Sequence, residues 1–361
     1  NVVLPYSEAA VPVSIASNTY VNGLGTITFN GKLTLIGYET FKQCLSLTSI
    51  TIPDGVTSIG TWAFNGCSSL ISITIPNSVT TIEYGALESC KSLTSIIIPD
   101  SVTSIGGRAF NGCSSLTSII IPDSVTSIGE WTFYNCDSLT SITIPDSVTT
   151  IGIYAFNSCN SLKSITIPDS VTKIGDNAFE FCESLTGVTI GNSVMTIGNG
   201  AFRGCSSLTN VTIPDSVTMI GESAFVICSS LVEFNGTFAS DDGRCLMIYG
   251  TLNSFAPAGL TEYTIPDTVA TIGDDAFNDC DTLTSVTIPG SVTKIGDYAF
   301  YSCSSLKSVY CMATTPPSLG TATFKNNGSG RKIYVPTESV DAYKNATRWS
   351  EYADAVVGYE F

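Results

Sequence analysis

The chain has 361 residues, 43% apolar and 13% charged, so it can build a sizeable core and has too little charge for a disordered chain. Its 31 acidic and 15 basic residues leave a formal net charge of −16, which argues against binding to nucleic acid or to an anionic membrane surface. Histidine is absent, which excludes mechanisms that use imidazole as a base or as a metal ligand.

The first 34 residues lack the periodic pattern that follows them, and we expect residues 1–34 to form an N-terminal cap. The pattern itself is marked by cysteines 23 residues apart, which indicates a structural repeat. One full copy, Leu116 to Ser138, reads LTSIIIPDSVTSIGEWTFYNCDS. The cysteines that follow this spacing are Cys44, Cys67, Cys90, Cys113, Cys136, Cys159, Cys182, Cys205, Cys228, Cys280 and Cys303.

The copies share the frame L-x-x-I-x-I-P-D-S-V-x-x-I-G-x-x-A-F-x-x-C. Its first part alternates apolar and polar residues and predicts a short strand with one buried face. The Pro-Asp-Ser step predicts a turn, and V-x-x-I-G predicts a second short buried segment that ends in a glycine bend. The A-F-x-x-C segment is too short for a stable helix, so we expect a single helical or 3₁₀ turn that buries Phe and Cys.

A single copy cannot fold alone. Burying its nine or so apolar side chains contributes roughly 15–25 kcal/mol, whereas ordering its backbone costs at least about 20–45 kcal/mol. Stacked neighbours reverse this balance, which predicts a solenoid of about thirteen coils over residues 35–310, with a parallel β-sheet on one face.

Two stretches interrupt the period. Residues 232–262 are predicted to form an irregular coil with a hairpin, turning at Asp242-Gly243 and returning through Cys245 to Tyr249. Residues 311–361 are predicted to form a degenerate last repeat and a C-terminal cap, with a helix from about Val340 to Trp349 over the last sheet edge. No apolar run approaches the roughly 20 residues that span a bilayer, so we expect no integral membrane segment in this chain.

The frame IPDSVTSIG-x-x-AF-x-x-C-x-SLTSI resembles the BspA-like leucine-rich repeats, a 23-residue bacterial subtype. The resemblance covers about residues 30–350. It implies a right-handed leucine-rich repeat solenoid and a secreted or cell-surface binding protein, in a family with some members linked to adhesion to host glycoproteins. It brings no catalytic residues. The second coil departs from the frame, with Glu83 in place of glycine and Leu87 in place of phenylalanine.

Two repeated columns could hold chemistry. The stacked cysteines are close enough for disulfides or a metal, but we interpret them as buried packing thiols. The stacked aspartates, such as Asp100 and Asp123, could bind calcium, but we interpret them as turn residues and expect no metal or other cofactor. The Asp-Ser-Val triplets are also similar to an O-glycosylation sequon used by some bacteria with such repeat proteins. O-glycosylation of these triplets therefore stays open as an alternative.

Two surface features are candidate binding sites. Arg108, Trp131 and Tyr154 occupy the same position of consecutive coils, with Tyr134 nearby, and should stack as a packing ladder or as a platform for a partner or glycan. Three isoleucines on the outer face of the sheet, Ile71, Ile97 and Ile120, form a second candidate, because an exposed apolar patch can mark a contact.

Enzyme motifs are missing: the sequence has no P-loop, no G-x-G-x-x-G and no G-x-S-x-G. A β-helix polysaccharide lyase or hydrolase would need converging carboxylates, and the irregular coil offers only Asp241, Asp242 and Arg244. We therefore predict a non-catalytic, monomeric binding protein, extracellular or on the cell surface. Its expected partner is a protein or glycoprotein. The alternatives are a glycan-binding protein that uses the aromatic column and a structural spacer of an envelope protein.

Overall fold

The structure, a computed structural model, describes residues 14–21 and 24–361. The chain divides into two compact units, Asn1–Leu162 and Lys163–Phe361, and each is described by itself. Both consist of coils whose short strands pair in parallel with those of neighbouring coils, about 14 turns in all, with few helices. The predicted parallel solenoid is therefore confirmed, and the predicted number of coils is close.

The first unit begins with an antiparallel hairpin. Strand β1 (Ser14–Val21) pairs with β2 (Leu24–Asn30). Both strands belong to the predicted cap at 1–34, of which residues 1–13 and 22–23 lie outside the described part of the chain.

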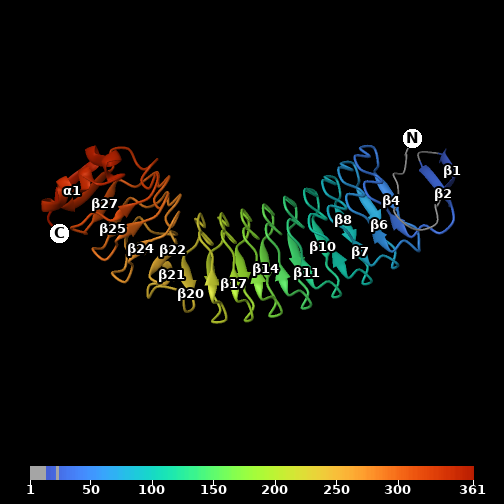
Figure 1. The fold of residues 1–361 in the computed structure, drawn as a ribbon, viewed down its shortest axis with the longest axis horizontal. Coiled ribbons are helices and arrows are strands. Elements are labelled where there is room, and N and C mark those ends of the chain that lie inside the picture. The colour runs from blue at the N-terminus through green and yellow to red at the C-terminus, as the bar shows by residue number, and fades with distance from the viewer. Residues whose placement is uncertain (1–13, 22–23) are drawn as a thin grey trace. The chain divides into compact units, whose positions relative to one another are not determined.

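Two rows of strands make up the rest of the first unit. Partners are 23 residues apart, as Ser95 opposite Ser118 illustrates, and Figure 1 shows β4, β6, β8 and β10 side by side. The row that we call the strand face contains β4 (Ser49–Thr51), β6 (Ser72–Thr74), β8 (Ser95–Ile97), β10 (Ser118–Ile120) and β12 (Ser141–Thr143). The second row contains β3 (Leu35–Ile36), β5 (Ser58–Ile59), β7 (Thr81–Ile82), β9 (Ser104–Ile105), β11 (Ser127–Ile128) and β13 (Thr150–Ile151).

A third segment of each coil runs through A-F-x-x-C and forms consecutive turns. In the coil of Phe133, the N–H of Cys136 donates to the Phe133 carbonyl at 3.2 Å, which is the three-residue spacing of a 3₁₀ turn. The N–H of Trp131 instead donates to Ile153 of the next coil at 2.9 Å. Trp131 has a φ of 58°, so the segment cannot continue as a helix. These coil-to-coil bonds hold the turn segments together as the strand ladders hold the strands.

The second unit repeats this plan around one irregular coil. Its strand face contains β14 (Ser164–Thr166), β16 (Gly187–Thr189), β18 (Asn210–Thr212), β20 (Glu233–Asn235), β23 (Glu262–Thr264), β25 (Ser285–Ile288), β27 (Ser308–Cys311), β29 (Lys332–Pro336) and β30 (Val356–Tyr359). Its second row contains β15 (Lys173–Ile174), β17 (Thr196–Ile197), β19 (Met219–Ile220), β22 (Thr251–Phe255), β24 (Thr271–Ile272), β26 (Lys294–Ile295) and β28 (Ser318–Leu319).

The irregular coil carries two turns where the sequence analysis expected one. The turn at Asp242-Gly243 is present, because the Gly243 N–H donates to the Ser240 carbonyl at 2.8 Å. The chain then returns as β21 (Cys245–Ile248) and turns again at Tyr249-Gly250, so that β21 pairs antiparallel with β22. The returning strand therefore continues into a second hairpin, and β22 joins the parallel second row beside β24.

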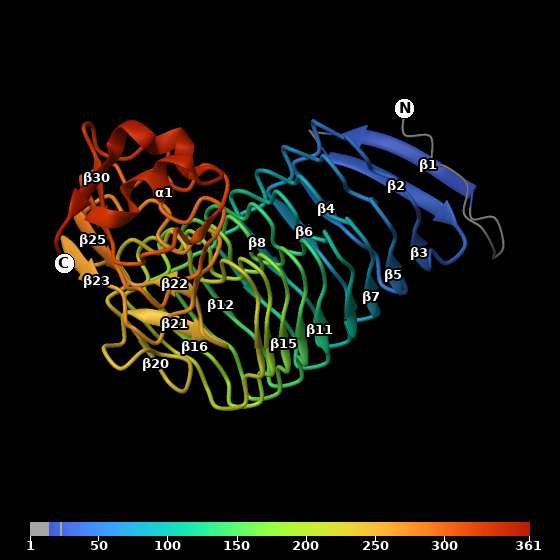
Figure 2. The same cartoon turned by 60° about the vertical axis from the view of Figure 1, so that its left-hand side comes forward.

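The C-terminal tail differs from the prediction. A 3₁₀ turn (Thr337–Ser339) leads into α1 (Val340–Asn345), which stops four residues earlier than expected because Ala346 adopts an extended ψ of 148°. A further 3₁₀ segment (Trp349–Ala355) follows. The last strand of the sheet is β30, which pairs in parallel with β29. Helix α1 belongs to the connection between these two strands and contacts both, and Figure 2 shows it beside β30. The sheet edge is therefore formed by a strand.

Stacked phenylalanine rings fill the core of the regular coils. Phe110 and Phe133 lie 5.5 Å apart with planes 4° from parallel, and Phe202 and Phe225 lie 5.1 Å apart. Leu87, which replaces one phenylalanine of the first unit, is fully buried in the same column. The frame therefore places one large apolar side chain of each coil in this column, and successive side chains are separated by the distance between neighbouring coils.

The cysteine column is an internal hydrogen-bonding ladder of thiols. The 13 cysteines, all of which the structure describes, are thiols and not disulfides, and all of them except the half-buried Cys44 are buried. Cys136 Sγ donates to the Phe110 carbonyl at 3.3 Å, and Cys205 Sγ to the Phe179 carbonyl at 3.2 Å, in each case 26 residues back. Burial raises the pKa of Cys113 to about 12. These thiols are packing groups, as predicted, and they also donate hydrogen bonds to the preceding coil.

Candidate binding surfaces

Arg108, Trp131 and Tyr154 lie on consecutive coils, as the sequence predicted, and their side chains are in contact. The Trp131 and Tyr154 ring centroids are 4.3 Å apart with planes tilted by 30°. The Arg108 guanidinium carbon lies 5.0 Å from the Trp131 centroid. Tyr134 joins the group, with its centroid 4.6 Å from that of Trp131. We call these four residues the aromatic column.

Both faces of the Trp131 ring are covered. Arg108, from the preceding coil, lies over one face, and Tyr154, from the following coil, lies against the other. Arg108 is further held by Glu88, whose carboxylate oxygen is 3.9 Å from its Nη1. The column is half-buried, so it offers ring edges to solvent and no open Trp131 face. A sugar that stacks on aromatic rings needs such a face.

The column continues toward the N-terminus through residues that the sequence analysis did not include. The Arg108 guanidinium carbon is 5.9 Å from the Tyr84 centroid, and Tyr84 packs edge-on against Trp62 at 6.0 Å. This continuity depends on Gly85, because a Cβ there would lie 2.4 Å from an atom of the Trp62 indole. Gly85 occupies the column position of its coil, and its neighbour Tyr84 supplies the ring. Reading one fixed position per coil could not find that exchange.

Two of the three candidate isoleucines form a pair. Ile97 at the end of β8 and Ile120 at the end of β10 are register partners, and the two residues are 82% and 76% exposed. Ile71 is 52% exposed but precedes β6, three residues upstream of the shared register. Three residues correspond to about 10 Å along a strand. We therefore define the isoleucine pair as Ile97 and Ile120 alone.

The Asp-Ser-Val triplets have a structural role in the turns. Ser101 Oγ donates to the Val79 carbonyl at 2.7 Å and Ser147 Oγ to the Val125 carbonyl at 2.6 Å, each on the preceding coil. Asp100 is exposed at its turn. Among residues 14–21 and 24–361, no three acidic or cysteine side chains converge as a metal site would require. The serine hydroxyls thus already link coils, while the glycosylation hypothesis itself is untested.

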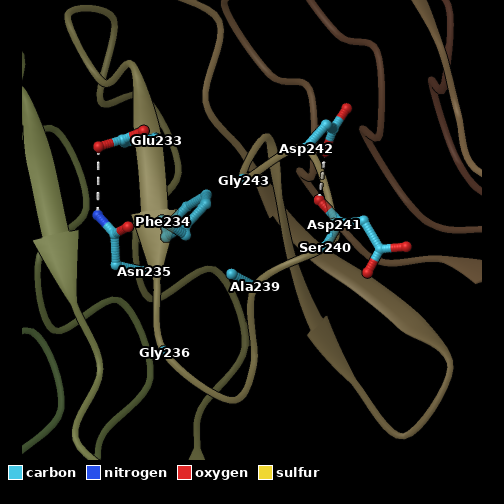
Figure 3. A pocket seen from close by; sticks show the side chains of 9 residues that line it. All are labelled: Glu233, Phe234, Asn235, Gly236, Ala239, Ser240, Asp241, Asp242 and Gly243. Atoms are coloured by element: carbon cyan, nitrogen blue, oxygen red, sulfur yellow. Dashed lines mark hydrogen bonds between the residues drawn. The ribbon is translucent and has the colours of Figure 1, made fainter.

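The irregular coil contains a shallow cavity of about 260 Å³ between β20 and the Asp242 turn (Figure 3). Asp242 accepts hydrogen bonds from Ser240 Oγ at 2.6 Å and from the Tyr263 hydroxyl at 2.9 Å. Burial acts to raise the Asp242 pKa, but these bonds, together with one from the Arg244 N–H, outweigh burial and lower the pKa. Arg244 Nη1 donates to the Ala258 carbonyl at 2.9 Å. Asp242 and Arg244, which an enzyme site here would need, are therefore engaged in holding the coil.

Comparison with known proteins places the fold in a family. The model of the BspA type leucine rich repeat region matches residues 14–140, 127–239 and 251–348, well over half of the chain. The chain belongs to the BspA-type leucine-rich repeat family. No curated protein matches it. Family members are commonly surface-associated and used for protein binding, and the family is generally non-catalytic. In the described part of this BspA-type protein, no helix has the length and apolar character needed to cross a bilayer.

Solved structures agree with this assignment. A leucine-rich repeat protein from Bacteroides ovatus is 27% identical, with a TM-score of 0.61 over 98% of this chain and 100% of its own. A leucine rich cell surface protein from Faecalibacterium prausnitzii is 26% identical, with a TM-score of 0.58 over 99% of this chain and 94% of its own. A leucine-rich repeat protein from Eubacterium ventriosum, 24% identical over 83% of this chain and 90% of its own, shares the fold with a TM-score of 0.55.

Proposed function

We propose that this BspA-type protein is a non-catalytic, adhesin-like binding protein, secreted or displayed at the cell surface, that contacts a protein or glycoprotein partner. The observation that carries the proposal is the isoleucine pair. Ile97 and Ile120 expose most of their side chains at a position that is threonine in the neighbouring strands β6 and β12. Exposed aliphatic side chains at a site where the repeat supplies threonine are consistent with a contact surface.

The surroundings of the pair favour a protein surface as the partner. The pair lies on the strand face among exposed serine and threonine side chains, such as Ser95 and Ser118. An apolar centre with a polar rim is the arrangement found in protein–protein interfaces. The cell-surface description of the Faecalibacterium relative supports the proposed location.

The aromatic column is less suited to be the primary site. Both faces of Trp131 are covered, so we assign the column mainly to packing between coils. This assignment favours the protein or glycoprotein reading over the glycan platform. A pure spacer remains the competing class, and it differs from both because it has no ligand.

The test is binding of the purified chain to parallel glycan and glycoprotein arrays at physiological salt. The variant Ile97→Thr/Ile120→Thr restores the residue that β6 and β12 carry, so it should fold normally. We expect it to lose at least about tenfold in affinity for the captured partner, because truncating two central apolar contacts costs on the order of 1–2 kcal/mol each.

The matched control is Trp131→Gly/Tyr154→Gly, because Gly85 and Gly200 naturally occupy that position with positive φ. The control should keep its binding, and thermal unfolding verifies that it stays folded without these packing contacts. Loss of binding in the control alone would move the site to the aromatic column. No binding to any array component by the unmodified chain would contradict the proposal and favour the spacer.

A further inference from the structure

A second cluster of aromatic side chains lies on the strand face of the second unit, at its C-terminal end. Tyr310 on β27 and Tyr334 on β29 are register partners, and their rings stack 4.7 Å apart with planes 14° from parallel. The Tyr359 ring stands edge-on beside both, 5.3 Å from Tyr310 and 5.6 Å from Tyr334. Phe361 packs edge-on against Tyr359 at 5.1 Å. We call these four residues the tyrosine cluster.

One face of the Tyr310 ring borders the short side chain of a neighbouring strand. Tyr334 covers one face of Tyr310, and the register partner of Tyr310 on the other side is Thr287 of β25. No other ring or guanidinium group of the described residues stacks on that side of Tyr310. This differs from Trp131, both of whose faces are covered. Beside this face, the half-buried outward positions of β25 and β27 carry the hydroxyl side chains of Ser285, Thr287 and Ser308.

Two lysines border the cluster. Lys332 precedes Tyr334 by two residues on β29 and therefore shares its outward face, about 7 Å away along the strand. Lys307 is on the adjacent coil, where its carbonyl accepts the Lys332 N–H at 2.8 Å. Neither lysine belongs to the ion pairs found among the described residues. Glu360, the acid nearest in sequence to the cluster, accepts a hydrogen bond from Thr337.

The charge of this end differs from that of the rest of the chain. Residues 294–361 contain seven of the 15 basic residues but six of the 31 acidic ones. At physiological ionic strength, charges more than about 8 Å apart are largely screened, so a ligand senses the local lysines before the net charge of −16. This end can therefore attract an anion although the whole chain is strongly acidic.

We propose that the tyrosine cluster with Lys307 and Lys332 binds an anionic glycan, whose carboxylate or sulfate groups pair with the lysines while a sugar ring stacks on the Tyr310 face beside Thr287. The three features match three properties of such a ligand. Aromatic faces attract sugar C–H groups, serine and threonine hydroxyls exchange hydrogen bonds with sugar hydroxyls, and unpaired lysines attract the acid groups. This ligand class deepens the binding role proposed above and rests on it, but at a different surface.

The experiment measures affinities of the intact chain for two anionic hexasaccharides, with maltohexaose as the neutral control. The hyaluronan hexasaccharide carries carboxylates alone, and the heparin hexasaccharide carries sulfates as well. Lys307→Gln/Lys332→Gln should weaken binding of the anionic sugars at least about tenfold. Lys325→Gln/Lys344→Gln removes the same charge elsewhere in the unit and should change it less than about threefold. Tyr310→Thr, which restores the residue of β25, should weaken it as strongly as the lysine pair.

A fourth variant should act in the opposite direction. Glu262 of β23 is the register partner of Ser285 and bounds the hydroxyl surface two strands from Ser308. Glu262→Gln should strengthen binding of the anionic sugars by less than about twofold, because the repelling charge is roughly 10 Å from Ser308 and largely screened at physiological salt. Thermal unfolding of each variant verifies that it is folded.

Several results would overturn this proposal. The first is that neither anionic sugar binds at physiological salt. The second is that the two lysine double variants lose the same amount of affinity. The third is that a poly-glutamate peptide binds as tightly as the sugars and that Tyr310→Thr does not weaken its binding. The last result would identify a charge-only site for acidic peptides. The two proposals fail separately, because Ile97→Thr/Ile120→Thr should leave sugar binding unchanged while the lysine pair should leave the array partner unaffected.

Discussion

The regular and irregular coils of the second unit fill the same interior with different side chains. In a regular coil, the Phe202 ring stacks between those of Phe179 and Phe225, at 5.2 and 5.1 Å. In the irregular coil at 232–262, Phe255 on β22 takes the equivalent place, 4.5 Å from Phe277. The ring belongs to a turn segment in the regular coil and to a hairpin strand in the irregular coil.

The two kinds of coil also use different side chains to donate hydrogen bonds to backbone carbonyls. The regular coil satisfies the Phe179 carbonyl with the Cys205 thiol. The irregular coil satisfies the Ala256 and Ala258 carbonyls with Arg244, at 3.3 and 2.9 Å. Its own thiol, Cys245, lies 3.2 Å from the Tyr263 hydroxyl. Both kinds of coil therefore supply a ring and a donor from different sequences, and Leu87 shows that another large apolar side chain can replace the ring.

The largest effect is expected from removing a ring. Phe202→Ala should lower the free energy of unfolding by about 3–5 kcal/mol, because a fully buried ring leaves a cavity. Phe255→Ala should cost a similar amount if the two coils are equivalent. Urea denaturation measures both, with Phe202→Leu as the control, since Leu87 occupies this column naturally. A Phe255→Ala loss below about 1 kcal/mol would show that the irregular coil does not carry the core.

The next effect tests the guanidinium of the irregular coil. Arg244→Ala should lower the free energy of unfolding by about 2–4 kcal/mol, because two carbonyls lose a charged donor. Arg244→Lys should recover part of this loss, since an ammonium group can still reach one carbonyl. Chemical denaturation of the three proteins provides the comparison. An Arg244→Ala variant as stable as the parent would remove the structural role that we assign to this arginine.

A smaller effect is expected for the thiol of a regular coil. Cys205→Ala should cost about 1–2 kcal/mol through the lost side-chain volume and the lost S–H donor. Cys205→Val fills the volume without a donor and so separates the two contributions. If the valine variant matches the parent in thermal unfolding, the hydrogen bond adds nothing and volume alone explains the column.

The last effect concerns alkaline pH, and it is close to zero at pH 8 and grows as the pH rises. Burial raises the pKa of Cys228 in a regular coil and of Cys245 in the irregular coil to about 12, from an ordinary value of 9.0. Above pH 9 the unfolded chain loses thiol protons that the folded chain keeps, so stability falls with rising pH up to about 12. Cys228→Val should reduce this slope by at most about 1.4 kcal/mol per pH unit. Denaturation midpoints between pH 8 and 11 measure it, and an unchanged slope would contradict the assignment.

The repeat made much of the fold predictable from the sequence. Residues 23 apart face each other across a parallel ladder, so the strand rows, the buried Phe column and the contact between Trp131 and Tyr154 follow from one copy of the frame. The end of α1 was not predictable in this way, because residues 340–349 lack the period and the extended backbone of Ala346 is a local outcome.

The surface chemistry was less predictable for a specific reason. Tyr84 enters the aromatic column only because Trp62 lies over Gly85, and this exchange changes which position of the coil supplies the ring. Tyr310 and Tyr334 are 24 residues apart, so a search at a period of 23 does not align them. Their stacking becomes evident only from the pairing register of β27 and β29 in the structure. Both features arise where the chain departs from its repeat.

The direction of the side-chain hydrogen bonds has a consequence for biosynthesis. The Cys136 thiol donates to Phe110, the Ser147 hydroxyl to Val125 and the Thr117 hydroxyl to Thr94, in each case to a coil that precedes the donor. Because a ribosome releases the N-terminal coils first, each new coil meets acceptors that are already in place. A stack that has formed at the N-terminal end can therefore be extended coil by coil, with each added coil offering acceptors to the next.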